Sequence, residues 1–251
     1  MGFKDHFSAH AETYQAFRPD YPQELFAWLS DLTPRHQRAW DCATGNGQAA
    51  QGLSRYYDEV IATDASETQI AQANPLPGVQ YRVASAEASG LAENSVDLIT
   101  VAQAYHWFDH QAFHQEAKRV LHPGGLLALW TYHLFHTPRP EFDAVIQHYY
   151  RDIVGAYWPP ERVWVDHGYR GMEFPFVELD APEFTIELEW TLEHVLGYLR
   201  SWSATQAYSK ATGKDPIQSI EHKLQRHWPD TVNLTIIWPM ALRVGRDTLK
   251  T

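Results

Sequence analysis

The stretch Asp41–Ala50 reads DCATGNGQAA and sets two glycines between an apolar run and a run that suits a helix. Gly45 and Gly47 allow a tight turn and a close approach of the backbone to a ligand. In an open parallel sheet, ligands bind beyond the carboxyl ends of the strands, where a loop joining a first strand to a first helix would lie. The spacing also fits the dinucleotide fingerprint G-x-G-x-x-A, and a purely structural turn would use the same glycines. The loop alone leaves these interpretations open.

Short β-rich runs alternate with helix-like runs around this loop. The expected strands are Ala39–Cys42, Glu59–Thr63, Val79–Ala84, Ser95–Ala102 and Leu126–Tyr132. The expected helices between them are Gln48–Tyr56, Glu67–Ala73 and His110–Leu121, the last ended by the HPGG run at 122–125. This alternation predicts an α/β domain built of βαβ units around a largely parallel sheet.

The segments on either side have different patterns. A helix is expected at about Pro22–Leu32, ahead of the first strand, and an aromatic helix at Glu141–Tyr157. A Pro- and Gly-rich stretch follows at 159–182, and the alternation in FTIELEW (184–190) predicts a strand. Two helical stretches within Thr191–Trp228 and a last strand near Asn233–Trp238 complete the chain.

Composition narrows the class of function. Hydrophobic residues make up 44% and charged residues 20% of the 251 residues, which is an ordinary globular composition. The formal net charge is −11 and no run of Lys and Arg interrupts it, so we expect no nucleic-acid partner. No apolar run approaches the roughly 18–20 residues that span a bilayer, and no secretory signal is recognisable, so we expect no membrane partner. The single cysteine, Cys42, fits a reducing compartment, and we expect a cytoplasmic location.

Two acidic side chains refine the ligand of the glycine loop. Asp64 ends the run EVIATD near the roughly 20-residue spacing at which an acid takes two ribose hydroxyls, while capping of the next helix is the alternative. The carboxylate of Asp41 would oppose a pyrophosphate but would favour a ligand that carries an ammonium and a sulfonium. The loop therefore suits S-adenosylmethionine better than NAD.

The motifs resemble those of a known family. DCATGNG (41–47) resembles the first motif of class I S-adenosylmethionine-dependent methyltransferases, and TD (63–64) resembles the second. SAEASGLAENSVDLITVAQAYHWFD (85–109) resembles the segment that closes the adenine pocket, and RVLHPGGLLALW (119–130) resembles the helix, turn and fifth strand. With AYHWFD and the early FRPDYP (17–22), the likeness is to small-molecule methyltransferases of type 11, of the trans-aconitate methyltransferase kind, over about residues 10–133.

The resemblance implies a fold and a set of cofactor contacts. The fold is a Rossmann-like, doubly wound, mostly parallel seven-stranded sheet with an N-terminal helical segment and a C-terminal helical and aromatic elaboration. One domain would span residues 1–251, with a cofactor-binding core (10–133), a substrate-covering elaboration (134–230), and the last strand and tail (231–251). The implied contacts are Asp41, Ala43, Gly45, Gly47 and Gln103 with the methionine part, Asp64 with the ribose, Ala65 with the adenosine, Ser85, Ala86 and Glu87 with the adenine, and Tyr14 and Arg18 from a covering N-terminal segment. Ala43 stands where the family usually has glycine, and Ser85 where it often has aspartate.

The candidates for the chemistry follow the expected fourth strand. His106 is either a catalytic base, because an imidazole has a pKa near neutrality, or a residue that orients the loop by hydrogen bonds. Trp107 would lie beside the sulfonium or simply pack. Tyr132 and His133 are further candidates for the substrate wall. No histidine pair is accompanied by the cysteines or paired carboxylates of a zinc site, so we expect no metal.

Six of the ten tryptophans lie beyond residue 150, where they either fill the core or line a pocket. We expect at least one of Trp158, Trp164 and Trp202 in a lid over the loops after the fourth and fifth strands, with Arg18 facing the same cavity. The expected function is methyl transfer from S-adenosylmethionine to a small-molecule acceptor, for which the resemblance points to the carboxylate of an organic acid. The alternatives are an NAD-dependent oxidoreductase, which Asp41 and the HPGG turn disfavour, and a non-catalytic S-adenosylmethionine-binding protein.

Overall fold

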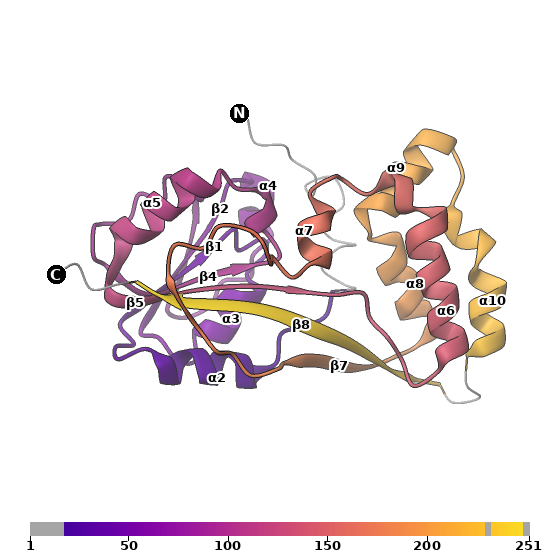
Figure 1. The fold of residues 1–251 in the computed structure, drawn as a ribbon, viewed down its shortest axis with the longest axis horizontal. Coiled ribbons are helices and arrows are strands. Elements are labelled where there is room, and N and C mark those ends of the chain that lie inside the picture. Colours follow the sequence, from indigo (N-terminus) through magenta and orange to yellow (C-terminus); the bar gives the residue numbers. More distant parts are fainter. Residues whose placement is uncertain (1–17, 229–231, 248–251) are drawn as a thin grey trace.

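A twisted sheet flanked by helices forms one part of the molecule, and a group of helices beyond the end of the sheet forms the other (Figure 1). The computed structural model describes residues 18–228 and 232–247, so the predicted contact residue Tyr14 lies outside the described residues.

The strands of the described chain form one eight-stranded sheet. They are β1 (Arg38–Cys42), β2 (Glu59–Asp64), β3 (Val79–Val83), β4 (Val96–Ala102), β5 (Leu121–Tyr132), β6 (Val177–Leu179), β7 (Thr185–Trp190) and β8 (Leu234–Arg246). The main path runs β3-β2-β1-β4-β5-β8-β6, while β7, the strand predicted at 184–190, pairs with β8 off this path. The first five strands pair in parallel, and β8 runs antiparallel to β5. The strand order reverses between β1 and β4, which is where an open α/β sheet binds its ligand.

Helices cover both faces of the sheet, so the predicted doubly wound α/β fold is confirmed (Figure 1). The helices are α2 (Gln23–Leu32), α3 (Gln48–Leu53), α4 (Glu67–Ala71), α5 (His110–Val120), α6 (Pro140–His148), α7 (Arg162–Asp166), α8 (Leu192–Arg200), α9 (Ser203–Thr212) and α10 (Glu221–His227). On one face, Leu25 of α2 and Leu53 of α3 join the larger apolar core, which continues into the helical part. On the other face, Phe113 and Val120 of α5 join a second core with Val165 of α7.

The helical part differs from the sequence expectation in one informative place. The helix expected at Glu141–Tyr157 ends as α6 at His148 and continues as a π-helical turn, Tyr149–Ile153, and a 3-10 turn, Gly155–Tyr157. Such turns rotate the side chains out of α-helical register. Tyr150 consequently contacts Trp158 and Trp202, with ring centroids 5.0 and 5.7 Å apart.

Two strand boundaries also differ from the expectation, and one strand is additional. The last strand was expected to end at Trp238 but extends to Arg246, because its second half pairs with β5. β5 begins at Leu121 and includes the HPGG run, whose Gly124 has a φ of +78°. β6 was not predicted, since it is only three residues long and lies within the Pro- and Gly-rich stretch 159–182.

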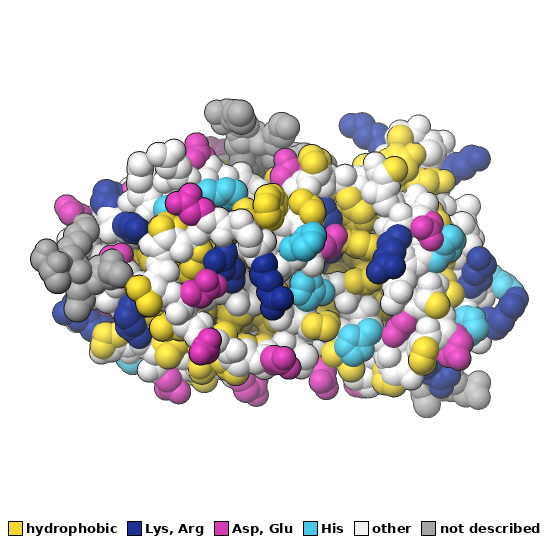
Figure 2. Space-filling view, viewed as in Figure 1, with side chains coloured by type: hydrophobic (Ala, Val, Ile, Leu, Met, Phe, Trp, Pro, Cys, Tyr) yellow, Lys and Arg dark blue, Asp and Glu magenta, His cyan; other side chains and the backbone are white. Residues whose placement is uncertain are grey.

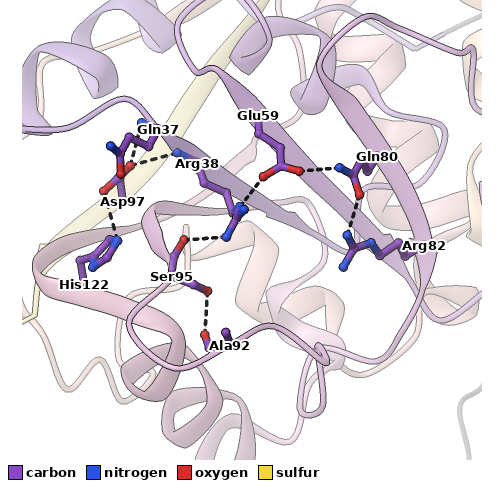
Figure 3. Close-up of polar contacts among 9 residues, drawn as sticks. All are labelled: Gln37, Arg38, Glu59, Gln80, Arg82, Ala92, Ser95, Asp97 and His122. Atoms are coloured by element: carbon purple, nitrogen blue, oxygen red, sulfur yellow. Dashed lines mark hydrogen bonds and ion pairs between the residues drawn. The ribbon is translucent and has the colours of Figure 1, made fainter.

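The amino ends of the parallel strands carry a polar network (Figure 3). Asp97 at the start of β4 accepts backbone hydrogen bonds from Gln37 (2.9 Å) and Arg38 (3.0 Å). Arg38 pairs with Glu59 at 2.5 Å, and Glu59 accepts a further hydrogen bond from Gln80. These contacts tie β1, β2, β3 and β4 together at the edge opposite the glycine loop.

In the part of the chain that the structure describes, no helix is long and apolar enough to cross a membrane. Acidic and basic side chains are mixed over the face shown in Figure 2, and acidic ones follow its lower edge. On this face, neither acidic nor basic side chains gather into a single large patch.

Candidate active site

The glycine loop leaves β1 in a series of left-handed backbone conformations. Ala43, Gly45 and Gly47 have φ angles of +56°, +58° and +97°. Side chains in this region usually cost about 1–2 kcal/mol, so Ala43 holds a strained conformation in the place of the family's glycine. A Cβ on Gly47 would lie 2.5 Å from the Tyr81 hydroxyl oxygen, whereas one on Gly45 would meet only Gln69 Oε1 at 3.8 Å. Gly47 is thus required by packing, and the space above Gly45 is open.

Asp41 lies beneath the loop and organises it. Its carboxylate is fully buried and accepts hydrogen bonds from the hydroxyls of Thr100 (2.8 Å) and Thr44 (2.5 Å). Burial raises the pKa of Asp41 to about 6, against the lowering effect of the two threonines. Asp41 therefore supports the loop from below, and its predicted contact with the methionine part remains a prediction.

Asp64, at the carboxyl end of β2, joins the glycine loop to the next helix. One carboxylate oxygen accepts from the backbone N–H of Gly45 and the other from that of Ser66, both at 2.9 Å. Ser66 itself caps α4, because its hydroxyl accepts from the backbone of Gln69. Capping of α4 thus belongs to Ser66, and Asp64 and Ala65 lie half-buried beside the loop.

The predicted adenine segment follows β3 at the same edge of the sheet. Ser85 forms an isolated bridge with Ala88, and Ala86 is buried in the second core. The Glu87 carboxylate accepts a hydrogen bond of 3.2 Å from the backbone of Asp109, which caps α5. Parallel pairing brings the carboxyl ends of β1, β2, β3 and β4 to one edge. We call the predicted cofactor residues at this edge, 41–47, 64–65 and 85–87, the cofactor edge.

A cavity lies next to the cofactor edge, beyond the carboxyl ends of β4 and β5. We call it the aromatic cavity, and its lining residues are Arg18, Gln103, His106, Trp107, Tyr132, His133, Leu134, Trp158, Pro159, Arg162, Val165, Tyr198, Trp202 and Ser203. Trp158, Trp202 and Arg18 share this cavity, as predicted, whereas the role of the tryptophans as a lid over the cofactor stays a prediction. Trp164 does not line it and is 36% exposed.

Two arginines reach this cavity from different segments. Arg18 donates a 3.0 Å hydrogen bond to the Tyr132 hydroxyl, and its guanidinium lies 5.4 Å from the centre of the Tyr198 ring. Arg162 of α7 lies over Trp158, at 4.5 Å from the ring centre. The Arg162 Nε donates to the Tyr150 hydroxyl (2.8 Å) and to Asp166 (3.1 Å), which fixes the plane of the guanidinium.

The histidines of the cavity are neutral at physiological pH. Burial and, to a smaller extent, the nearby charge of Arg162 together lower the pKa of His106 to about 3. Burial lowers the pKa of His133 too, while Asp166 opposes the shift. A histidine with so low a pKa is a weak general base. Within residues 18–228 and 232–247, no three His, Cys, Asp or Glu side chains gather as metal ligands.

Gln103 has a strained backbone and an unpaired amide. Its φ is +60°, and its side-chain oxygen accepts a 2.8 Å hydrogen bond from the Thr131 hydroxyl. Its amide nitrogen is buried and has no hydrogen-bond partner among the described residues. A buried unpaired donor costs about 1–3 kcal/mol, so it fits a ligand that supplies an acceptor oxygen. Together with the open space above Gly45, it suits a cofactor that carries a carboxylate.

Four residues of this region were missed from the sequence: Thr131, Arg162, Tyr169 and Tyr198. Arg162 had a usable signal, since it follows the aromatic and proline-rich run YWPPE within a loop-like stretch. Thr131 lies on a strand and Tyr198 on a helix, and the sequence patterns of both elements are typical of the protein core. Tyr169 lies in a turn and has a φ of +61°. The sequence around these three residues contains no signal that would mark them as part of a functional site.

Comparison with known proteins gives a consistent result. Residues 40–129 match the family model described as "Methyltransferase domain". A candidate methyltransferase of Dictyostelium discoideum is 34% identical over 232 residues, which cover 91% of this chain and 88% of that protein. A solved structure of a candidate type II methyltransferase from Anaeromyxobacter dehalogenans is 44% identical with a TM-score of 0.88, covering 93% of this chain and 99% of that chain. The Bacillus protein YcgJ, at 16% identity and a TM-score of 0.54 over 90% of this chain and 99% of that chain, shares the fold alone.

Proposed function

The chain belongs to the class I S-adenosylmethionine-dependent methyltransferases, and from that premise we propose that it methylates a carboxylate of a small organic acid. The observation that carries the acceptor is the aromatic cavity, where two arginines lie among aromatic rings and beside a neutral histidine. We further propose that the cofactor edge holds the methyl donor and that the reaction is cytoplasmic, as the sequence predicts.

The fit of the described residues supports the proposed site of the methyl donor. Asp64 would accept from the ribose hydroxyls while it keeps its bonds to Gly45 and Ser66, since each carboxylate oxygen has more than one lone pair. Gly45 would let the backbone approach the methionine part, and Ala86 and Glu87 would bound the adenine. When bound, S-adenosylmethionine supplies a methyl group already activated by its sulfonium.

The charges and pKa values of the cavity support the proposed acceptor class. Arg18 and Arg162 favour an anionic ligand, because guanidinium groups bind carboxylates strongly. The pKa of about 3 makes His106 a poor base for a hydroxyl, whose proton would have to be removed. Transfer to a carboxylate yields a neutral ester and a thioether without moving a proton, so no base is needed.

The contribution of the chain is to position the acid and to exclude water. Trp158 and Trp202 come from the helical part, whereas Gln103 and His106 follow β4, so the cavity is closed by segments far apart in sequence. Such a site orients two reactants and removes water from the reacting charges. It also limits the acceptor to small molecules.

A paired-substrate assay tests this function. The full chain is incubated with methyl-labelled S-adenosylmethionine and a panel of small carboxylic acids, each beside its primary amide and its alcohol. We expect label only in base-labile methyl esters, detected by mass spectrometry. Label confined to the oxygen of the alcohols or to the nitrogen of the amides would contradict the carboxylate assignment.

A binding measurement separates this function from the nicotinamide alternative. S-adenosylhomocysteine should raise the melting temperature, because a ligand that binds only the folded state stabilises it. NADH at the same concentration should leave the melting temperature unchanged.

A further inference from the structure

The two arginines of the aromatic cavity are bonded in different ways. Arg18 uses a terminal nitrogen, since its Nη1 donates to the Tyr132 hydroxyl at 3.0 Å. Arg162 uses its Nε, which donates to the Tyr150 hydroxyl at 2.8 Å and to Asp166 at 3.1 Å. No described residue accepts a hydrogen bond from either terminal nitrogen of Arg162, whose side chain is 23% exposed. The two terminal nitrogens of a guanidinium can bind a carboxylate through two parallel hydrogen bonds.

Aromatic side chains of the helical part fix the guanidinium of Arg162. Its central carbon lies 4.5 Å from the ring centre of Trp158 and 5.3 Å from that of Tyr150. The two rings lie 5.0 Å apart, and the indole N–H of Trp158 donates to the Tyr150 carbonyl at 3.3 Å. Tyr150 belongs to the π-helical turn, a rare element that is often found at functional sites. This packing immobilises the arginine before a ligand arrives, which lowers the entropy cost of binding.

The charge of Arg162 acts inside the cavity although Asp166 pairs with it. The Asp166 side chain is 42% exposed, so water screens its charge more than that of Arg162. Burial is the main cause of the low pKa of His106, and the positive charge of Arg162 is the next cause. Asp166 is not among the groups that shift this pKa, whereas it does oppose the lowering of the pKa of His133. An anion bound beside His106 therefore meets a positive group.

We propose that Arg162 binds the carboxylate of the methyl acceptor through its two terminal nitrogens and selects acids over neutral molecules, with Tyr150 as the residue that positions it. This inference rests on the proposed function, since it names the residue that recognises the acceptor. Each carboxylate oxygen has two lone pairs, so one remains for the methyl group. Because the carboxylate loses its charge as the ester forms, Arg162 stabilises the bound acid at least as much as the transition state. Its contribution is therefore to the affinity for the acid.

Nuclear magnetic resonance on the cofactor-free full chain tests the binding step without turnover. The Nε–H signal of Arg162, assigned from the Arg162→Gln variant, is followed at pH 7 while acetate or benzoate is added at constant ionic strength, each beside its primary amide. We expect at least one acid, and neither amide, to shift this signal saturably. The Nε–H signal of Arg200 is the internal control, because Arg200 pairs with Asp215 at 3.4 Å and does not line the cavity. The absence of a shift with both acids, or an equal shift with an amide, would overturn the proposal.

Two neighbouring tyrosines of the π-helical turn separate positioning from general stability. Tyr150→Phe removes the hydroxyl that bonds Arg162 and Asp166, whereas Tyr149→Phe removes a hydroxyl that bonds Thr205 at 2.8 Å. In the same titration, we expect the affinity for the acid to fall roughly fivefold in Tyr150→Phe and to stay unchanged in Tyr149→Phe. Equal losses in the two variants would overturn the positioning role of Tyr150.

The split between kinetic constants tests the role of Arg162 in turnover. On an acid that the carboxylic-acid assay identifies, Arg162→Gln should raise KM for the acid roughly tenfold or more and should change kcat and KM for S-adenosylmethionine much less. Arg162→Lys restores the charge but not the two-point contact, so it should recover only part of the affinity. A wild-type KM for the acid in Arg162→Gln would overturn the proposal. A saturable shift of the Arg162 signal without ester formation would instead refute the proposed function and leave the carboxylate site in place.

Discussion

The cofactor edge and the aromatic cavity are neighbours in space but are built in different ways. The cofactor edge consists of short consecutive segments, each following a parallel strand, and its key contacts are backbone hydrogen bonds to Asp64. The aromatic cavity is assembled from single side chains that lie as far apart in sequence as Arg18 and Trp202. Local sequence motifs can therefore encode the first, whereas packing between the sheet and the helical part creates the second.

The two regions also differ in the sign of their charged groups. The cofactor edge buries a carboxylate, Asp41, whose pKa rises to about 6. The aromatic cavity keeps two arginines and lowers the pKa of His106 to about 3. A negative group beneath the loop suits a cationic donor, and positive groups around the cavity suit an anionic acceptor. Each prediction below perturbs one region and leaves the other as the internal reference.

The largest expected effect is that of Gly45→Val. A branched side chain would occupy the open space above the loop, and we expect the affinity for S-adenosylhomocysteine to fall roughly 100-fold or more, about 3 kcal/mol, by calorimetry. The matched control is Gly213→Val, since Gly213 has a similar φ of +71° and equally open surroundings at the end of α9. Both variants should lose a comparable roughly 1–2 kcal/mol of folding stability. Normal binding by Gly45→Val would mean that the loop is only structural.

Asp41→Asn should change how folding stability depends on pH. The pKa of Asp41 is about 6 in the folded chain and 3.8 ordinarily, so the folded state binds this proton more tightly. The protonated group therefore stabilises the fold below about pH 4, and that stability is lost as the pH rises through 6. We expect the variant to lack this loss and to gain up to about 3 kcal/mol at pH 7 in urea unfolding, while its cofactor affinity falls. An unchanged pH profile would show that Asp41 does not titrate in this range.

Asp64→Ala should weaken S-adenosylhomocysteine binding by roughly 1.5–3 kcal/mol, because the ribose hydroxyls lose a charged acceptor. The control is Asp97→Ala at the opposite edge of the sheet (Figure 3), since Asp97 also accepts two backbone hydrogen bonds. Asp97→Ala should lower the stability and spare the affinity. Equal affinity losses in the two variants would point to loop disorder rather than to a ribose contact.

The smallest effect concerns the cavity alone. Arg162→Gln removes a positive charge that lowers the pKa of His106, and we expect that pKa to rise by about one unit. Arg170→Gln is the control, because Arg170 influences His133 but is not among the groups that shift His106. Nuclear magnetic resonance titration of the imidazole signals from pH 7 to pH 2 measures the His106 pKa in both variants and in the wild type. A His106 pKa that does not move would place Arg162 outside the electrostatics of the cavity.

The sequence by itself determined the fold class, the parallel core and the cofactor edge. Alternating strands and helices specify a parallel sheet, and the glycine loop and Asp64 keep their spacing because each directly follows its strand. Helix limits were less predictable. Ending α6 at His148 and starting the π-helical turn depends on where Tyr150 packs against Trp158 and Trp202, which are distant partners.

Only the tertiary structure decided the chemistry of the cavity. The sequence marked His106 as a residue with a pKa near neutrality, but burial beside Arg162 lowers its pKa to about 3. The sequence also named Gln103, yet the direction of its amide depends on Thr131, which lies on the neighbouring strand. Desolvation and hydrogen-bond direction arise from surroundings that no local pattern contains, whereas the loop after a strand is set by the strand itself.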